Sequence, residues 1–209
     1  MPRKSQTIDL ARRSPRQARA VDTVEIIFEA TARILQREGP AALNTNYIAE
    51  RAGISVGTLY QYFPNKEAIL VAMARREIET DGAAVIRAIS EAEDGAADPV
   101  RMAIRAMIHA FSKRRVARRI AFETLVSQGL GNELAKSVQK IAHILGERSD
   151  RLLPGRARPV TPVSLFVITR AISGIMRAAS QEESPLLGAP EFEDELVRLV
   201  QSYFAGPPA

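Results

Sequence analysis

Hydrogen-bonding and charged side chains are concentrated in one short stretch, residues 44–66. Tyr60 and Tyr62 carry phenolic hydroxyls, Thr58 offers a hydroxyl and a methyl group, and Lys66 adds a positive charge. Such groups can hydrogen-bond to phosphate oxygens, and a methyl group can contact a thymine methyl in the major groove of DNA. The stretch therefore has the chemistry of a nucleic-acid contact surface, provided that the backbone presents these side chains together.

The apolar and helix-breaking residues of the same stretch predict two short helices joined by a tight turn. The first helix is predicted over residues 46–52, and Gly53 suits the left-handed conformation that ends it, because glycine has no Cβ atom. Ser55 can cap the second helix, predicted over residues 55–63, and Pro64 ends it. A glycine-containing turn between two such helices can place the second helix in a DNA major groove. The alternative is an ordinary helical hairpin with half-buried tyrosines, because the pattern also occurs outside DNA-binding proteins.

The predicted DNA-binding residues are those that the two helices leave exposed, with one residue just beyond them. They are Thr45, Asn46, Ser55, Val56, Gly57, Thr58, Tyr60, Gln61, Tyr62 and Lys66. We expect Tyr62 and Lys66 to contact phosphates. The side chains expected nearest the base edges are those of Asn46, Val56, Thr58 and Tyr60.

Several short motifs of this stretch resemble the DNA-binding signature of the TetR family of bacterial repressors. They are Ile48-Ala49, Ala52-Gly53-Ile54-Ser55, Gly57-Thr58-Leu59-Tyr60, Tyr62-Phe63 and Lys66, and the resemblance covers about residues 21–78. It implies an all-helical homodimer with an N-terminal DNA-binding domain and a C-terminal domain that binds a ligand and forms the dimer. It also implies DNA contacts at Thr45, Asn46, Val56, Gly57, Thr58, Tyr60, Tyr62 and Lys66. The sequence departs from the family at Asn44, where threonine is frequent, and at Asn46, where arginine or another long residue is common.

The excess positive charge of the chain lies at its N-terminus. The net charge is +5 over 209 residues, and residues 1–20 contain six basic residues against the single acidic residue Asp9. Residues 1–19 also lack helical periodicity, so we predict a flexible basic arm ahead of the first helix. Such an arm can bind DNA phosphates or enter the minor groove, or it can be a solvated tail without that role.

The remaining sequence predicts an all-α fold of about nine helices without strands. Apolar residues recur at helical spacing over residues 20–38, and we expect this first helix to brace the helix-turn-helix through Phe28. The predicted parts are a flexible arm (1–19), a DNA-binding domain (20–80, with the helix-turn-helix at about 44–63) and a ligand-binding and dimerisation domain (81–209).

The C-terminal part contains candidates for a ligand pocket and a dimer interface. The predicted helix over residues 161–182 has a stripe of small residues beside its apolar stripe. We expect it to bury two sides, one of them against a second copy of the chain together with the helix at 190–204; alternatively, both helices only close the core of one chain. The candidate pocket residues are Ile104, Met107, Phe111, Phe122, Phe166 and Met176. The candidate interface residues are Ala171, Gly174, Ala178, Leu196, Leu199 and Tyr203.

Several other protein classes are disfavoured. The chain has no cysteine and no apolar core of a signal peptide, and Arg170 and Arg177 interrupt its longest apolar stretch. We therefore expect a cytoplasmic protein without a membrane span. His109 and His143 lack partners at metal-binding spacing, so we expect no metal, no cofactor and no catalytic site.

The expected function is a transcriptional regulator that binds a palindromic operator as a dimer. We expect a repressor that a small apolar or amphipathic effector releases from DNA, with activation as an alternative to repression. The competing hypotheses are a helical enzyme or small-molecule-binding protein without a DNA function, and a helical scaffold for another protein. Neither accounts for both the basic arm and the stretch at residues 44–66.

Overall fold

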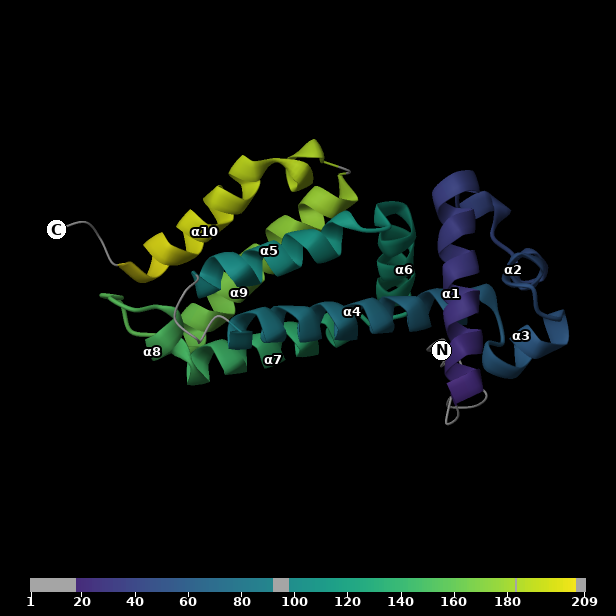
Figure 1. Cartoon of the computed structure of the whole chain (residues 1–209), viewed down its shortest axis with the longest axis horizontal. Coiled ribbons are helices and arrows are strands. Elements are labelled where there is room, and N and C mark those ends of the chain that lie inside the picture. Colours follow the sequence, from purple (N-terminus) through teal and green to yellow (C-terminus); the bar gives the residue numbers. More distant parts are fainter. Residues whose placement is uncertain (1–17, 92–97, 183, 206–209) are drawn as a thin grey trace, which may run out of the picture. The chain divides into compact units, whose positions relative to one another are not determined.

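The computed structural model describes residues 18–91, 98–182 and 184–205. All regular elements in these ranges are helical (Figure 1), which confirms the predicted all-α class. The predicted basic arm lies outside the described residues, apart from its last two positions. Contacts between residues group the chain into two compact units: unit 1 is Met1–Arg76 with Val116–Leu130, and unit 2 is Glu77–Arg115 with Gly131–Ala209.

Unit 1 contains the helices that the N-terminal sequence predicts. They are α1 (Ala18–Glu38), α2 (Thr45–Ala52), α3 (Val56–Tyr62), the start of α4 (Lys66–Glu91) and α6 (Arg115–Ser127). A short 3-10 helix, η1 (Pro40–Ala42), connects α1 to α2. The ends of α1, α2 and α3 lie within two residues of the predicted ends.

The core of unit 1 holds α2 and α3 against α1. Phe28 of α1 is buried, and its ring centroid lies 5.9 Å from that of Phe63, the residue that ends α3. Ile48 of α2 and Leu59 of α3 are fully buried. Thr31 of α1 is a polar side chain in this core, and its hydroxyl donates to the Ile27 carbonyl at 2.8 Å. The first helix is therefore the predicted brace of the helix-turn-helix.

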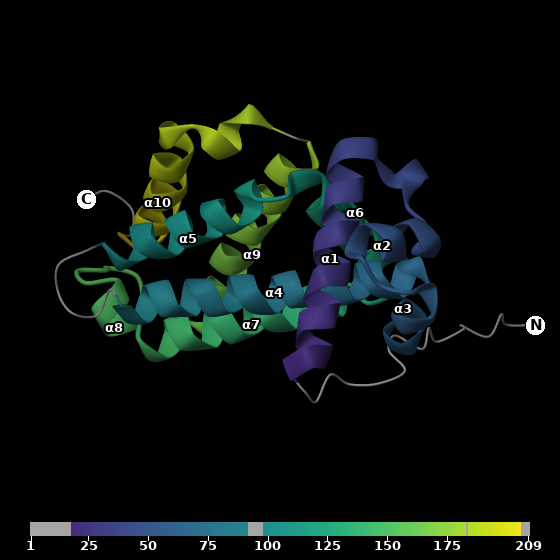
Figure 2. The same ribbon diagram turned by 45° about the vertical axis from the view of Figure 1, so that its right-hand side comes forward.

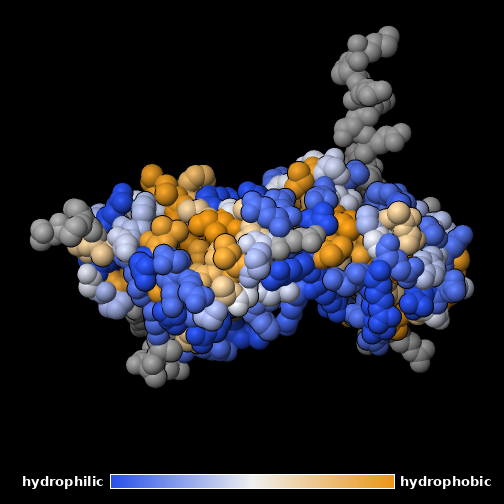
Figure 3. All heavy atoms as spheres, turned by 90° about the horizontal axis from the view of Figure 1, so that it is seen from above, coloured by the Kyte–Doolittle hydropathy of each residue, from blue (hydrophilic) through white to orange (hydrophobic). Residues whose placement is uncertain are grey.

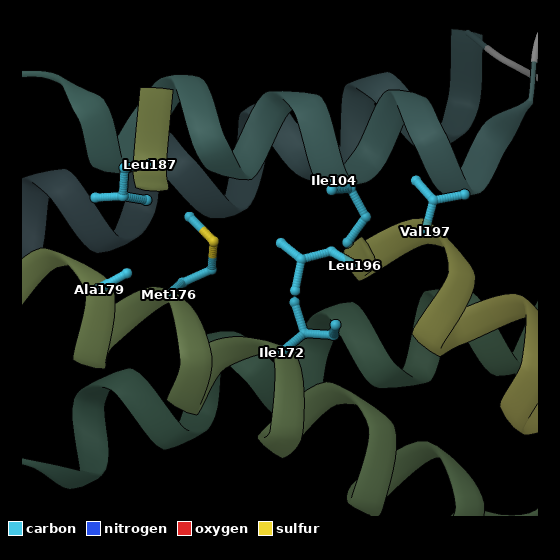
Figure 4. Packing of buried hydrophobic residues seen from close by; sticks show 7 residues of the cluster. All are labelled: Ile104, Ile172, Met176, Ala179, Leu187, Leu196 and Val197. Atoms are coloured by element: carbon cyan, nitrogen blue, oxygen red, sulfur yellow. The ribbon is translucent and has the colours of Figure 1, made fainter. Parts of the chain in front are cut away.

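Unit 2 is built around α9 (Pro162–Gln181). The other elements are the second part of α4, α5 (Pro99–Ser112), α7 (Asn132–Glu147), α8 (Ser149–Leu152), η3 (Pro185–Gly188) and α10 (Pro190–Ala205). Helix α9 contacts α5, α7, η3 and α10, and Figures 1 and 2 show it running between α5 and α7. Its buried face contributes Ile172, Met176 and Ala179 to a cluster with side chains of α5, η3 and α10 (Figure 4).

Helix α9 is also long and apolar enough to cross a membrane by length and composition, the only such helix in the described ranges. Core helices pass the same test. Because α9 packs Ile172 and Met176 into the cluster of Figure 4 and carries Arg170 and Arg177, we interpret it as a core helix.

Two glycines allow α7 to pack closely against its neighbours in unit 2. A Cβ atom at Gly82 of α4 would lie 2.8 Å from the Ser137 hydroxyl oxygen, and one at Gly146 of α7 would lie 2.9 Å from a methyl carbon of Leu165 in α9. These distances are shorter than real Cβ contacts, so a larger residue at either position would require the Ser137 or Leu165 side chain to move.

One local prediction in the second half of the chain is wrong. The sequence predicts one helix from a cap at Asn132 to Leu153, but Gly131 occupies the N-cap position and α7 ends at Glu147. Arg148 has φ −112° and ψ 12°, so its backbone interrupts the helix before the single turn of α8. By its contacts, most of α6 groups with unit 1, although it follows α5 in the sequence.

Candidate DNA-binding surface and ligand cavity

The stretch at residues 44–66 forms a helix-turn-helix with a cap at each junction. The Asn44 side chain accepts a hydrogen bond from the Tyr47 amide at 2.9 Å and caps α2. Gly53 ends α2 in the left-handed conformation, with φ 69°. The Ser55 hydroxyl accepts from the Thr58 amide at 3.0 Å and caps α3. These side-chain bonds satisfy backbone donors that a short helix otherwise leaves unpaired.

Helix α3 turns one face into the core of unit 1 and the other outward. Leu59 is fully buried, whereas Val56 and Tyr60 are 36% and 38% exposed. Gly57 and Gln61 are also exposed, and Thr58 and Tyr62 are half-buried. The outward face is therefore made of residues predicted to contact DNA.

Two pairs of hydroxyl groups join predicted DNA-binding residues. The Thr45 hydroxyl, at the start of α2, lies 3.0 Å from the Tyr60 hydroxyl of α3. The Ser55 and Thr58 hydroxyls lie 2.8 Å apart at the start of α3. Each pair holds two polar groups at a fixed separation, although a hydroxyl can also accept or donate a further bond. The structure thus brings four of the predicted residues together, and Asn46 lies exposed on α2 beside Thr45.

Lys66 is held at the edge of the same surface. Its ammonium group donates to the Leu43 carbonyl at 3.2 Å, and the residue is half-buried. An ammonium group has three donors, so this bond positions the charge and leaves capacity for a phosphate oxygen.

Tyr47, which the sequence does not single out, ties α2 to the end of α1. Its hydroxyl donates to both carboxylate oxygens of Glu38, at 2.9 and 3.1 Å, and the Arg51 guanidinium lies 5.7 Å from its ring centroid. The hydrogen bond to Glu38 raises the pKa of the Tyr47 hydroxyl. The sequence offers only the spacing of Tyr47 and Arg51 on one helix face as a signal, because the position of Glu38 depends on the fold.

Unit 2 contains an apolar cavity of about 90 Å³. Helix α4 contributes Val85 and Ile89, and α5 contributes Ile104 and Met107. The other lining residues are Pro99, Val100, Ala103, Val138, Ile141, Leu145, Leu152, Leu153, Leu165, Ile168, Thr169, Ile172, Ser173, Val200 and Phe204. None of them is charged, and the only side-chain polar atoms belong to Thr169 and Ser173.

The structure brings only part of the predicted pocket together. Ile104 and Met107 line the cavity, whereas Phe111 and Met176 pack into the cluster of Figure 4 and its surroundings. Phe122 lies in α6 of unit 1, beneath the guanidinium of Arg118 at 5.3 Å from the ring centroid. Phe166 is 61% exposed and lines a groove between α7 and α9. Residue type does not reveal which side of a helix faces the cavity, and this explains the four residues that lie elsewhere.

The candidate interface residues also differ in their surroundings. Leu196 is buried in the core cluster of its own chain, so it is not available to a partner. Leu199 is 39% exposed, and Tyr203 is half-buried. The small residues of α9, Ala171, Gly174 and Ala178, are half-buried. No group of three or more potential metal ligands comes together within the described part of the chain.

Comparison with known proteins relates the helix-turn-helix to a family of bacterial regulators. Residues 27–73 match the family model described as bacterial regulatory proteins, tetR family. The HTH-type transcriptional repressor KstR of Mycolicibacterium smegmatis is 44% identical over 62 residues, which are 30% of this chain and 30% of that repressor. The chain thus aligns with about a third of the length of that relative.

Weaker similarity extends over most of the chain. An HTH-type transcriptional regulator of Mycobacterium tuberculosis is 26% identical over 162 residues, which are 76% of each chain. The crystal structure of the TetR-family repressor FadR of Thermus thermophilus, in complex with lauroyl-CoA, has the same fold. It matches with a TM-score of 0.59 and 18% identity, over 89% of this chain and 95% of that one. Residues 27–73 therefore resemble the DNA-binding domain of the tetR family of bacterial regulatory proteins, and the chain as a whole shares the fold of TetR-family structures.

Proposed function

We propose that the protein is a dimeric, ligand-responsive transcriptional repressor that binds a palindromic operator. The observation that carries this proposal is the capped helix-turn-helix, whose outward face consists of Val56, Gly57, Tyr60 and Gln61. In this proposal α3 enters the major groove, and Tyr62 and Lys66 contact phosphates. The side chains nearest the base edges are those of Asn46, Val56, Thr58 and Tyr60. The proposed domains are an N-terminal DNA-binding domain and a C-terminal domain for ligand binding and dimerisation. The proposed location of the protein is the cytoplasm.

A second copy of the chain is proposed to cover one face of α9. Val163, Phe166 and Val167 are exposed at the start of this helix, and the face continues through the small residues at 171, 174 and 178. A Cβ atom added at Gly174 would meet nothing within 4 Å, so the chain itself does not fill this surface. Figure 3 shows apolar side chains gathered on the face of unit 2 that is seen from above. Leu199 of α10, which is 39% exposed, would extend the interface.

The dimer is tested with a matched pair of substitutions. Val167→Glu places a carboxylate on the proposed interface, whereas Val126→Glu places one at a 61% exposed position of α6. We expect sedimentation velocity to show a dimer for the parent and for Val126→Glu, and a monomer for Val167→Glu. A dimer that persists in Val167→Glu would reject this face as the interface.

An effector is proposed to bind in the apolar cavity and to act through α4. This helix lines the cavity with Val85 and Ile89, and the same continuous helix begins in unit 1 at Lys66. A ligand that binds best to a conformation with a shifted α4 would favour the state that fits DNA poorly. The complex of FadR with lauroyl-CoA supports a ligand with a long apolar part.

The DNA function is tested by operator affinity and its dependence on salt. Lys66→Ala should lower the affinity and reduce the salt slope by about one unit, because one phosphate contact is lost. Lys140→Ala, which removes the same charge from an exposed position of α7, is the control and should leave the slope unchanged. A parent protein without salt-dependent DNA affinity would favour the competing hypothesis of a small-molecule-binding protein.

A further inference from the structure

The apolar cavity of unit 2 continues toward solvent through a second, more polar hollow. This outer hollow has a volume of about 490 Å³. It shares Pro99, Val100, Leu152, Leu153 and Phe204 with the cavity, so the two adjoin. Its other lining residues include the exposed Pro154, Gly155, Gln201 and Ala205. The hollow therefore forms a mouth between the start of α5, the residues that follow α8, and the end of α10.

Two charged side chains line this mouth, Asp98 and Arg156. The carboxylate of Asp98 is already fully engaged. One oxygen accepts from the Val100 and Arg101 amides at 3.0 and 3.1 Å, and the other accepts from the Gln201 side chain at 2.9 Å. Asp98 thus caps α5 and links it to α10, and little capacity remains for a ligand cation.

Arg156 is fixed by the backbone but has an exchangeable acidic partner. Its guanidinium donates to the Ser149 carbonyl at 3.1 Å and more weakly to the Leu153 carbonyl at 3.5 Å. It also pairs with Asp150, whose side chain is 88% exposed, whereas the Arg156 side chain is only 24% exposed. An exposed carboxylate gains little from such a pair, because water competes for both charges. A ligand carboxylate in the mouth can take its place and use the planar, two-pronged geometry of the guanidinium.

Arg158 is close to Arg156 in sequence but does not line the mouth. Its guanidinium lies 4.6 Å from the centroid of the Tyr203 ring, and it lines a different hollow, together with Asp150 and Arg156. The amides of Ala157 and Arg158 donate to the Phe204 carbonyl at 3.2 and 3.1 Å. These bonds fix the segment that carries Arg156 to the end of α10, so the guanidinium is held at the mouth before any ligand binds.

We propose that this combined site binds an amphipathic monocarboxylic acid, with the carboxylate on Arg156 and the hydrocarbon chain in the apolar cavity. The proposal rests on the effector function proposed above and specifies its ligand class and polarity. The inner cavity rejects a charged head group, because none of its lining residues could compensate a buried charge. Its volume of about 90 Å³ exceeds the roughly 10–15 Å³ that one water requires, so it has room for several carbon atoms.

Calorimetric titration with octanoate, 1-octanol and octylamine tests the proposal on the full chain. We expect the parent to bind octanoate more tightly than 1-octanol and to bind octylamine least. Arg156→Gln should weaken octanoate binding by about tenfold or more, with little effect on 1-octanol, because only the charged head group loses its partner. Asp150→Asn should instead strengthen octanoate binding, because the competing carboxylate is removed.

Arg156→Gln and Asp150→Asn should change the affinity for octanoate in opposite directions, and this difference separates ligand binding from a structural role of Arg156. If Arg156 only held α8, both variants would alter octanoate and 1-octanol binding equally, and that result would overturn the proposal. Arg156→Lys keeps the charge, and we expect it to retain part of the preference for octanoate even if Arg156→Gln folds poorly. Failure of the parent to bind either octanoate or 1-octanol would also reject the site. DNA affinity measured on the same preparation tests the regulator function separately.

Discussion

Ser55 has two roles in this account, as the cap of α3 and as a residue facing DNA, and two substitutions separate them. Its hydroxyl accepts from the Thr58 amide at 3.0 Å and lies 2.8 Å from the Thr58 hydroxyl. Ser55→Ala removes both contacts and should lower the free energy of unfolding by about 1 kcal/mol, the usual cost of losing a serine cap. For a chain of this size the unfolding midpoint should fall by about 2–4 °C. Since α3 has only seven residues, the loss should also loosen the recognition helix and weaken DNA binding.

Ser55→Asp keeps the cap but adds a negative charge. Aspartate caps helices as well as serine does, and its charge favours the helix N-terminus, so the stability should match or exceed that of the parent. Its DNA affinity should nevertheless fall, because in the proposed complex a carboxylate at this exposed position would face the phosphates.

Thermal unfolding and fluorescence anisotropy with a labelled operator measure the two effects separately. Thr161→Ala is the matched control: it removes the cap of α9, which accepts from the Ser164 amide at 3.1 Å, in unit 2. It should lower stability without a direct effect on DNA contacts. Undiminished DNA affinity in Ser55→Asp would show that the start of α3 does not face DNA, and unchanged stability in Ser55→Ala would refute the role of the cap.

Substitutions at three further positions test other parts of the structure. Phe28→Ala should destabilise unit 1 by about 3–5 kcal/mol, because a buried ring that contacts Phe63 is lost. Urea unfolding measures this change, and an unchanged unfolding midpoint would contradict the role of α1 as a brace. Gly53→Ala should lower the free energy of unfolding by about 1 kcal/mol through the positive φ alone, since nothing lies within 4 Å of the added Cβ. Gly53→Asn should lower it less. Equal stability of the parent and both variants would argue against the left-handed turn.

Hydrogen bonds from Arg105 and Arg101 hold the pKa of Glu193 below its usual value. The stability that this carboxylate contributes is therefore complete above the ordinary glutamate pKa, about 4.3, and is lost as the pH falls through its lower folded value. Glu193→Gln should flatten the fall in unfolding midpoint between neutral pH and about pH 3, and a fall as steep as that of the parent would assign the acid sensitivity to other groups.

Local signals in the sequence were sufficient for the helix-turn-helix. The cap at Ser55, the left-handed glycine at 53 and the proline at 64 act on their nearest neighbours, so the ends of α2 and α3 could be predicted to within one residue. The hydrogen bond between Thr45 and Tyr60 could not, because it depends on how α2 and α3 pack.

The cavity was less predictable for the same reason. Phe122 and Phe166 have the residue types of a pocket, but the packing of their helices directs one into unit 1 and the other toward solvent. Arg156 lies in a proline-rich loop without periodicity, and only the bonds of its neighbours to Phe204 reveal its place at the cavity mouth. Long-range contacts of this kind leave no pattern in a single sequence.

The most direct test of the central claim is selection of genomic fragments by the purified protein, followed by sequencing of the retained DNA. We expect a shared palindrome whose half-sites lie one helical turn or a small multiple apart, about 34 Å per turn. The double variant Tyr60→Ala, Lys66→Ala should lose this selection. Retention of fragments without a common site, abolished at moderate salt, would contradict sequence-specific binding by α3.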